Sequence, residues 1–188
     1  LVAMIIIGSA MFKSLFENPK VIIREGPLQK NTEFQLKPGE TYSYTYLLND
    51  TGVNMTYAIL PGYGCTRIKL MEAVNSTGIC VDRWGMDESR SNASYMDPSI
   101  LLFKPWMLAL REGWTCNNTM FISYNGADEY VSDISYRVVR MENYSGRQSY
   151  VVEIKSGSGP AEYDWVDAEK RVLLRVKGEE YDVVLANE

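Results

Sequence analysis

Apolar and polar positions alternate along most of the chain, which predicts β-strands. The clearest example is residues 41–48, where Tyr42, Tyr44 and Tyr46 alternate with small polar residues. A period of two places the three rings on one face of a half-buried strand. Similar segments, separated by turns rich in Gly, Pro and Asn, predict strands at residues 21–23, 33–36, 41–48, 54–60, 67–72, 79–81, 120–124, 134–141, 149–155, 161–166, 171–177 and 181–185. We therefore predict a mainly β protein of antiparallel sheets, arranged as a sandwich or as a half-barrel meander.

Two stretches interrupt this pattern. Residues 82–98 form the longest irregular piece, and their acidic side chains are those of Asp82, Asp87, Glu88 and Asp97. Oxygen-rich loops can hold calcium, but this one lacks the Asp-x-Asp-x-Asp-Gly spacing of a calcium loop, so we interpret it as a glycosylated surface loop. Residues 100–114 are rich in apolar side chains and predict one helical turn leading into a strand, with a candidate sub-boundary of the domain at residues 98–105.

The N-terminal segment is the longest apolar run of the chain. Its apolar side chains include those of Leu1, Val2, Met4, Ile5, Ile6, Ile7, Met11 and Phe12, and the run ends before Lys13. It is shorter than the roughly 20 residues that a membrane-spanning helix needs. The open interpretations are the end of a transmembrane or signal-anchor helix, a filament core or donated strand that packs against other subunits, a signal-peptide core, and a buried element of the domain. We assign residues 1–18 to a membrane-anchor or assembly segment and residues 19–188 to an extracytoplasmic β domain.

Six Asn-x-Ser/Thr triplets lie between residues 49 and 145, several times more than this composition gives by chance. None has Pro in the middle, and the candidate acceptors are Asn49, Asn54, Asn75, Asn92, Asn117 and Asn143. Such triplets receive N-glycans only on the exposed surface of a secreted chain. Polar turn chemistry is the alternative explanation, because Asn, Ser and Thr also gather in loops. We favour glycosylation, which places the protein at a cell surface or outside the cell, and the dense triplets suit a prokaryotic surface, including an archaeal one.

The three cysteines are Cys65, Cys80 and Cys116, and no Cys-x-x-Cys spacing indicates a zinc or redox site. In an oxidising compartment the favoured bridge is Cys65–Cys80, which closes a loop of about 16 residues and contributes roughly 3 kcal/mol in the chain-entropy model. Cys80–Cys116 is the alternative bridge. One cysteine stays unpaired in either case, and we expect it to be buried rather than paired between chains.

Charge and residue usage argue against several classes of protein. The chain has a formal net charge of −5, which argues against nucleic-acid binding because phosphate contacts need a basic face. It contains no His, the commonest general base and metal ligand, and no phosphate-binding glycine motif. We therefore predict a protein that is not an enzyme and has neither a metal nor a cofactor. A carboxylate-based glycan hydrolase using Asp164, which flanks Trp165 together with Asp167, is the remaining enzymatic hypothesis, and turn caps are the preferred interpretation of both acids.

Several motifs in the C-terminal half form a series. They are Leu110-Arg111-Glu112-Gly113-Trp114, Tyr136-Arg137-Val138, residues 146–152, and the aromatic turn Tyr163-Asp164-Trp165-Val166-Asp167 with the apolar run that ends at Leu174. Over residues 105–186 the series resembles the curved meander of bacterial lipoprotein-carrier proteins and related envelope domains. The resemblance implies a half-barrel whose apolar face must be covered. Clear covering helices are lacking, so the cover would be the first half of the chain, a partner subunit or a lipid.

These features give two functional hypotheses. The first is a structural or interaction protein: a glycosylated extracytoplasmic β domain that self-associates in a pilus-like filament or joins a membrane-anchored complex through residues 1–18. The alternative is a membrane-anchored carrier that holds a hydrophobic ligand in the C-terminal half-barrel. The pocket of that carrier would be lined by Trp106, Met107, Trp114 and Trp165, which ordinary core packing would also explain.

Overall fold

The structure is a computed structural model that describes residues 20–25, 29–48, 51–71, 78–86, 101–124 and 127–187. For β1 (Lys20–Glu25) and some strand ends it describes the backbone alone. Residues singled out in the sequence that lie outside these ranges are Leu1, Val2, Met4, Ile5, Ile6, Ile7, Met11, Phe12, Asn49, Asn75, Asn92, Asp87, Glu88 and Asp97. The assignment of residues 1–18 to an anchor or assembly segment therefore stays a prediction.

Within the described residues, eleven antiparallel strands form one sheet, which confirms the predicted mainly β class. After β1 they are β2 (Thr41–Leu48), β3 (Thr51–Pro61), β4 (Thr66–Leu70), β5 (Ile79–Val81), β6 (Thr115–Tyr124), β7 (Ala127–Tyr144), β8 (Arg147–Ser156), β9 (Glu162–Asp167), β10 (Leu173–Lys177) and β11 (Tyr181–Asn187). Their order across the sheet is β1-β6-β7-β8-β9-β10-β11-β2-β3-β4-β5. Because β1 and β5 are two separate edges, the sheet is open and is not closed into a barrel.

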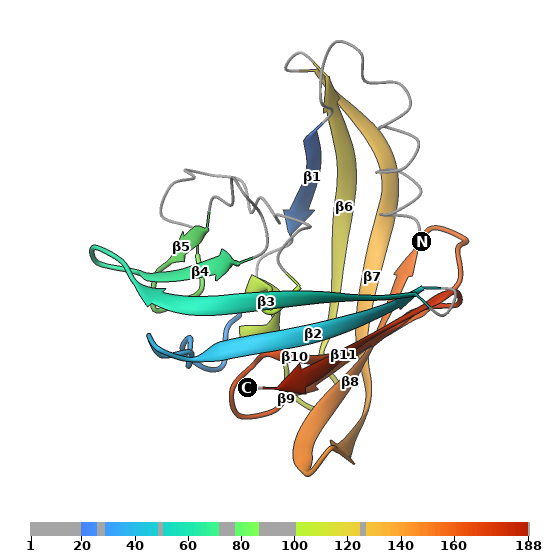
Figure 1. Cartoon of the computed structure of the whole chain (residues 1–188). Helices are drawn as coiled ribbons and strands as arrows, with labels where there is room; N and C mark the ends of the chain where they lie inside the picture. The colour runs from blue at the N-terminus through green and yellow to red at the C-terminus, as the bar shows by residue number, and fades with distance from the viewer. Residues whose placement is uncertain are drawn as a thin grey trace.

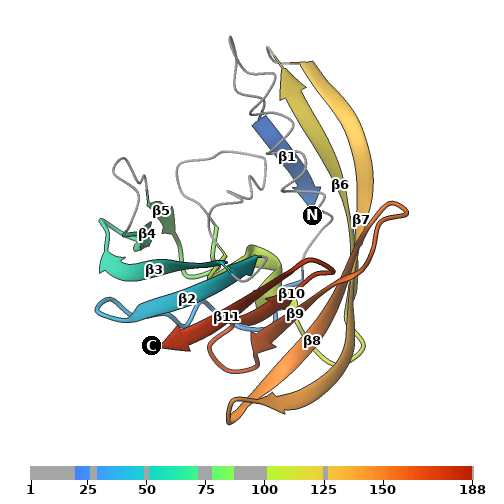
Figure 2. The ribbon, with the colours of Figure 1, turned by 45° about the vertical axis from the view of Figure 1, so that its right-hand side comes forward.

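Two meanders of consecutive hairpins, together with β1 paired to β6 at one edge, make up this sheet. Strands β6 to β11 form one meander and β2 to β5 form the other, and β11 joins them by pairing with β2, with Val183 opposite Tyr46. In Figure 1, β2 and β3 cross the molecule while β6 and β7 run up one side of it. The turned view in Figure 2 shows the sheet bending between these two wings. The consecutive antiparallel meander predicted for the last part of the chain is therefore confirmed.

Some element bounds differ from the prediction. Residues 33–36 are irregular, and the predicted strand there is absent. The strand predicted at residues 134–141 extends to the full length of β7, with a register shift between Val138 and Arg140. β10 begins at Leu173 because Arg171 has a φ of 59°, which lies outside strand conformations. The predicted helical turn is present as the 3-10 helix η1 (Pro105–Ala109).

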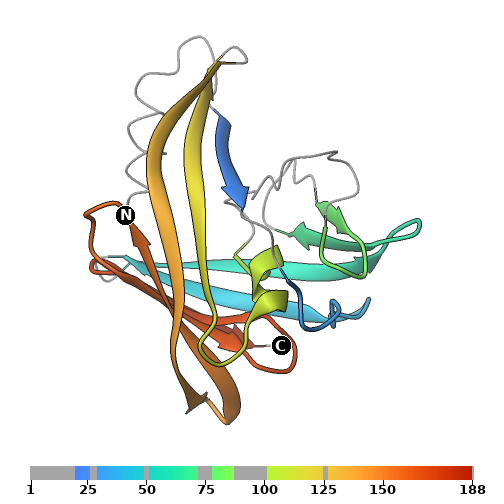
Figure 3. The ribbon, with the colours of Figure 1, turned by 180° about the vertical axis from the view of Figure 1, so that it is seen from behind.

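One face of the sheet, which we call the inner face, carries the core. The rings of Tyr42, Tyr44 and Tyr57 are fully buried on it, as the period of two predicts. Residues 101–110, which we call the inner segment, cover this face with buried side chains from Leu102 to Leu110. Figure 3 shows η1 of this segment between β6 and the β2–β3 pair. The chain thus supplies a cover for its own apolar face.

Backbone hydrogen bonds hold the inner segment near both of its ends. The N–H of Leu173, at the start of β10, donates to the carbonyl oxygen of Leu102 at 3.0 Å. The N–H of Asn31 donates to the carbonyl oxygen of Leu108 at 2.8 Å. These two donors come from opposite ends of the chain, so the seating of the inner segment depends on both.

Candidate functional site

Three candidate glycan acceptors lie in the described part of the chain: Asn54 on β3, Asn117 on β6 and Asn143 near the end of β7. All three side chains are exposed. The Oδ1 atom of Asn54 accepts a hydrogen bond from Oγ1 of Thr45 at 3.0 Å, and that of Asn143 accepts the N–H of Gly146 at 3.0 Å. Exposure meets the physical condition for a glycan acceptor, while the attachment of glycans stays a prediction.

Two of these asparagines share the face opposite the inner face, which we call the outer face. Asn54 pairs with Thr45, which lies between the buried Tyr44 and Tyr46. Asn117 pairs with Ser135, which neighbours the buried Tyr136. Because successive side chains of a strand point to opposite faces, both asparagines point away from the core. Glycans at these two positions would leave the inner segment undisturbed.

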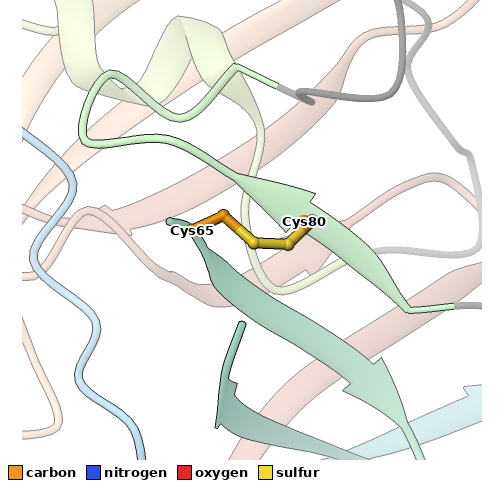
Figure 4. Close-up of a disulfide and its surroundings, with 2 residues drawn as sticks. All are labelled: Cys65 and Cys80. Atoms are coloured by element: carbon orange, nitrogen blue, oxygen red, sulfur yellow. A yellow bond between two sulfur atoms is a disulfide. The ribbon is translucent and has the colours of Figure 1, made fainter. Parts of the chain in front are cut away.

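Cys65 and Cys80 form the predicted disulfide, which is drawn in Figure 4. It links the residue before β4 to the middle of β5, with the two Cα atoms 5.7 Å apart. A Cβ added at Gly62 would collide with both sulfur atoms, so the β3–β4 turn packs directly on the bridge. Cys116 is unbridged and half-buried, and its Sγ donates to Oδ1 of Asn118 at 3.3 Å. The alternative Cys80–Cys116 bridge is therefore wrong.

The four side chains considered for a hydrophobic pocket divide between the two faces. Trp106, Met107 and Trp114 are buried in the inner core, and the rings of Trp106 and Trp114 stack with centroids 6.0 Å apart. The ring of Tyr136 lies 5.3 Å from that of Trp106. Trp165 points to the outer face, because Asp164 and Val166 on either side of it point inward, and its ring contact is with Tyr144 rather than with Trp106 or Trp114.

Trp165 instead lies in a cluster on the outer face. Its Nε1 donates to Oε1 of Glu142 at 2.5 Å, and its ring centroid lies 6.0 Å from that of Tyr144. The guanidinium carbon of Arg175 lies 5.1 Å from the Trp165 ring centroid, a cation–π geometry. Arg175 also donates from Nε to Oδ1 of Asp182 at 2.8 Å. Polar and aromatic neighbours from β7, β10 and β11 thus cover this indole.

Asp167, at the end of β9, caps a turn. Its Oδ1 accepts the N–H groups of Glu169 and Lys170, both at 2.8 Å. Its Oδ2 accepts a hydrogen bond from Nη1 of Arg147 at 3.2 Å. The interpretation of this acid as a turn cap is therefore confirmed.

Asp164 has a different environment, and its interpretation as a turn cap is wrong. It lies on the inner face of β9, is 5% exposed, and its Oδ1 has no hydrogen-bond partner among the described residues. Burial raises the pKa of this carboxyl well above its ordinary value, nearby Glu162 raises it further, and Lys104 acts in the opposite direction. Burial also raises the pKa of Glu162, which accepts a hydrogen bond from the hydroxyl of Tyr181. Both acids belong to one face of one strand, so they do not oppose each other across a cleft as a glycan hydrolase requires.

Sequence reasoning assigned no functional role to Arg171, which is 7% exposed and has a left-handed φ of 59°. Its Nη1 donates to the carbonyl oxygen of Leu110 at 3.1 Å, and its guanidinium carbon lies 4.9 Å from the ring centroid of Tyr150. Arg171 therefore holds the C-terminal end of the inner segment. In the sequence, Arg171 stands directly before the apolar run that starts at Val172, which could have indicated that its side chain is buried. The sequence does not show that its hydrogen-bond partner is the carbonyl oxygen of Leu110.

Within the described residues, no group of three or more His, Cys, Asp or Glu side chains is placed to hold a metal ion. Asp82, the described acid of the candidate calcium loop, accepts the N–H groups of Trp84 at 2.8 Å and Met86 at 2.9 Å. No helix in the described ranges is long and apolar enough to cross a membrane.

No protein-family model, curated protein or solved structure matches this chain. The resemblance to lipoprotein-carrier domains therefore stays a prediction.

Proposed function

We propose that the protein is a glycosylated, extracytoplasmic β domain with a structural or interaction role at the cell surface, as a subunit of a filament or of a membrane-anchored complex. The observation that carries this proposal is the exposure of Asn54, Asn117 and Asn143 on a sheet that also holds a disulfide. Disulfides persist in oxidising compartments, and N-glycans are added to exposed sites of secreted chains.

The inner face of the sheet is already filled, which supports an interaction role for other parts of the protein. The inner segment fills that face with the chain's own side chains, so the described sheet does not offer it to a partner. We assign attachment to residues 1–18, whose apolar side chains would bury in a membrane or in neighbouring subunits. The glycans would then cover outer-face positions such as Asn54 and Asn117.

Intact mass of the native, cell-derived protein tests the glycan part of the proposal. Thr56→Ala destroys the triplet that begins at Asn54, whereas Thr56→Ser keeps it and preserves the hydroxyl that lies 3.2 Å from Ser43 Oγ. We expect the Ala variant to lose the mass of one glycan and the Ser variant to retain it. An unmodified mass for the native protein would refute the proposal.

Electron microscopy of the same material in mild detergent tests the assembly part. We expect regular particles much larger than one chain, and we expect Ile6→Lys to abolish them by placing a charge in the apolar segment. Met71→Lys is the matched control, because Met71 is 54% exposed and lies in the β domain. Small, uniform particles from the native material would contradict a filament and leave the membrane-anchored complex.

A carrier of a hydrophobic ligand is the second candidate, and the bent, open sheet around an aromatic inner face favours it. Three of the four side chains proposed for its pocket, those of Trp106, Met107 and Trp114, do lie together. Because they pack on one another, a ligand would have to displace the inner segment. Added lipid should then raise the melting temperature in detergent, since a ligand that binds only the folded state stabilises it. An unchanged melting temperature would remove this candidate.

A further inference from the structure

The acceptor triplet that begins at Asn54 lies inside the sheet ladder, although the Asn54 side chain is exposed. Strand β2 pairs with the triplet along one edge of β3, with Thr45 opposite Asn54. At the other edge, the carbonyl oxygen of Thr56 accepts the N–H of Met71 at 2.8 Å. Oγ1 of Thr56, the hydroxyl that completes the triplet, lies 3.2 Å from Oγ of Ser43. Neighbouring chain therefore borders this triplet on both sides.

The triplet that begins at Asn117 is bordered in the same way. Strand β7 pairs with it along one edge of β6, with Ser135 opposite Asn117. Strand β1 pairs along the other edge, with Arg24 opposite Thr119. The hydroxyl of Thr119 donates to Oδ1 of Asp133, on β7, at 3.3 Å. In both triplets the hydroxyl of the third residue thus lies against a neighbouring strand.

The triplet that begins at Asn143 lies at an open end of the sheet. Gln148 of β8 pairs with Asn143 on one side. On the other side the pairing of β7 with β6 stops at Arg137, so none of the described strands borders the triplet there. Ser145, the last residue of the triplet, has a left-handed φ of 51° in the turn that joins β7 to β8. This triplet is therefore open along one side and at its end.

Attachment of an N-glycan requires a transferase to surround the triplet. The asparagine Nδ2 forms a bond to the anomeric carbon of a glycan carried on a polyisoprenyl phosphate. The bond from that carbon to the phosphate oxygen breaks, the phosphate keeps the electron pair, and a base of the enzyme takes one Nδ2 proton. Because the triplet must end in Ser or Thr, the enzyme also contacts that hydroxyl. In a sheet the next strand lies about 4.8 Å away, which leaves no room for an enzyme at the edges of a paired triplet.

We propose that Asn54 and Asn117 receive their glycans before the sheet forms, whereas Asn143 also accepts one on the folded protein. This inference rests on the proposed glycosylation and adds the order of glycosylation and folding. Both asparagines of the strand interiors point to the outer face, so glycans attached early do not enter the core when the strands pair. A chain that folds without these two glycans stays unmodified at both positions.

The order of synthesis leaves time for the early step at Asn54. An isolated two-stranded hairpin is only marginally stable in water. Strand β2, which pairs with the Asn54 triplet, gains its second neighbour from β11, the last strand of the sheet to be synthesised. The hairpin of β2 and β3 therefore opens repeatedly until the end of the chain has been made, and each opening exposes the triplet to the transferase.

The test uses the full chain, made in a host without the transferase and folded with its disulfide formed. The folded chain is incubated with membranes that contain an oligosaccharyltransferase and its polyisoprenyl-linked glycan, and mass spectrometry of glycopeptides measures the occupancy of each asparagine. We expect transfer to Asn143 and no measurable transfer to Asn54 or Asn117. Synthetic peptides of residues 51–59, 114–122 and 140–148, which form no sheet, should all accept the glycan.

Two variants of the full chain control the interpretation. Thr45→Ala removes the hydrogen bond to Oδ1 of Asn54 but keeps the strand pairing, so the folded variant should still exclude transfer to Asn54. Asn143→Gln should abolish transfer at the open end of the sheet and leave Asn54 and Asn117 unmodified.

The outcomes separate the order of events from glycosylation itself. Transfer to Asn54 or Asn117 of the folded chain at the rate of the matching peptide would overturn the inference and leave the proposed glycosylation standing. An unmodified Asn143 on the folded chain would overturn the contrast between the open end and the strand interiors. Transfer to Asn54 in folded Thr45→Ala would show that one hydrogen bond, and not strand pairing, closes that site. Failure of all three peptides, together with an unmodified mass of the native protein, would refute the proposed glycosylation.

Discussion

The two faces of strand β9 give their buried polar side chains different hydrogen-bond partners. On the outer face, Asp167 accepts two backbone N–H groups and Trp165 donates to Glu142. On the inner face, Asp164 has apolar strand neighbours, and its Oδ1 has no hydrogen-bond partner among the described residues. Asp164 and Asp167 are both 5% exposed, so burial alone does not separate them. The difference teaches that the partners of a buried polar group decide whether it stabilises the fold.

The same contrast extends over the whole sheet. The inner face is sealed by the inner segment and packs like a protein interior, so a change there leaves a cavity or a clash. The outer face carries exposed asparagines and clusters held by hydrogen bonds and ring contacts. We therefore expect substitutions on the inner face to have the larger effects on stability.

The largest effect is expected from Trp106→Ala. Trp106 is 2% exposed and stacks on Trp114, so its removal should lower the free energy of unfolding by about 3–5 kcal/mol. Trp165→Ala is the matched change on the outer face, where the indole is 7% exposed but is covered by the side chains of Tyr144 and Arg175. Because these side chains can relax into the space, we expect a smaller loss of about 2–3 kcal/mol. Urea denaturation followed by circular dichroism measures both. Equal losses would show that the two faces do not differ in packing.

The disulfide should give the next largest effect. Replacing Cys65 and Cys80 together by Ser should lower the free energy of unfolding by about 3 kcal/mol, because the unfolded chain regains the freedom of the closed loop. Cys116→Ser is the control, and its half-buried thiol predicts a loss of about 1 kcal/mol or less. Guanidinium denaturation without reductant measures both. A double variant as stable as the native protein would contradict this account of the bridge.

Substituting Asn for Asp164 or for Asp167 should change the free energy of unfolding in opposite directions at neutral pH. Burial raises the pKa of Asp164, so the native state holds its proton more tightly than the unfolded chain, and stability declines as pH rises above the ordinary Asp value. Asp164→Asn should remove this decline and raise the free energy of unfolding at pH 7 by on the order of 1 kcal/mol. Asp167→Asn should lower it by about 1–2 kcal/mol, since its charged oxygens accept three hydrogen bonds.

Thermal melts of both variants from pH 4 to pH 8 check this pair. The expected outcome is a flatter profile for Asp164→Asn than for the native protein and a lower profile for Asp167→Asn throughout. If both variants were destabilised equally at pH 7, the difference between the two faces of β9 would be refuted.

Period-2 patterns explain how much of this fold could be predicted from the sequence. In residues 41–48 the alternation of Tyr with small polar residues fixed both the strand and its buried face, and the structure agrees. The pairing of Cys65 with Cys80 was the favoured choice because they are close in sequence. Residues 33–36 were misjudged, because a short apolar pair such as Phe34 and Leu36 alternates in the same way when it packs on a core without forming a ladder.

Contacts between distant segments explain why the rest could not be predicted. The cover over the inner face depends on Asn31 and Leu173 reaching the same ten residues of chain, and no local pattern encodes that meeting. The acids around Trp165 show the same limit. The alternation of β9 assigns Asp164 and Asp167 to opposite faces, but which face is sealed depends on the inner segment.

The smallest effect on stability is expected from the ion pairs of the outer face. The size of each effect should depend on the geometry of the pair and on how exposed its side chains are. Arg137 donates to Glu153 at 2.8 Å, but its side chain is 59% exposed, so Arg137→Gln should cost about 0.5 kcal/mol or less. Arg175 pairs with Asp182 and also lies over Trp165, at 24% side-chain exposure, so Arg175→Gln should cost about 1 kcal/mol. A double-mutant cycle with Trp165→Leu isolates the cation–π part: the cost of Arg175→Gln should shrink when the indole is absent. If it did not shrink, the outer-face cluster would be an array of independent surface contacts, and the stability of the sheet would come from its inner face alone.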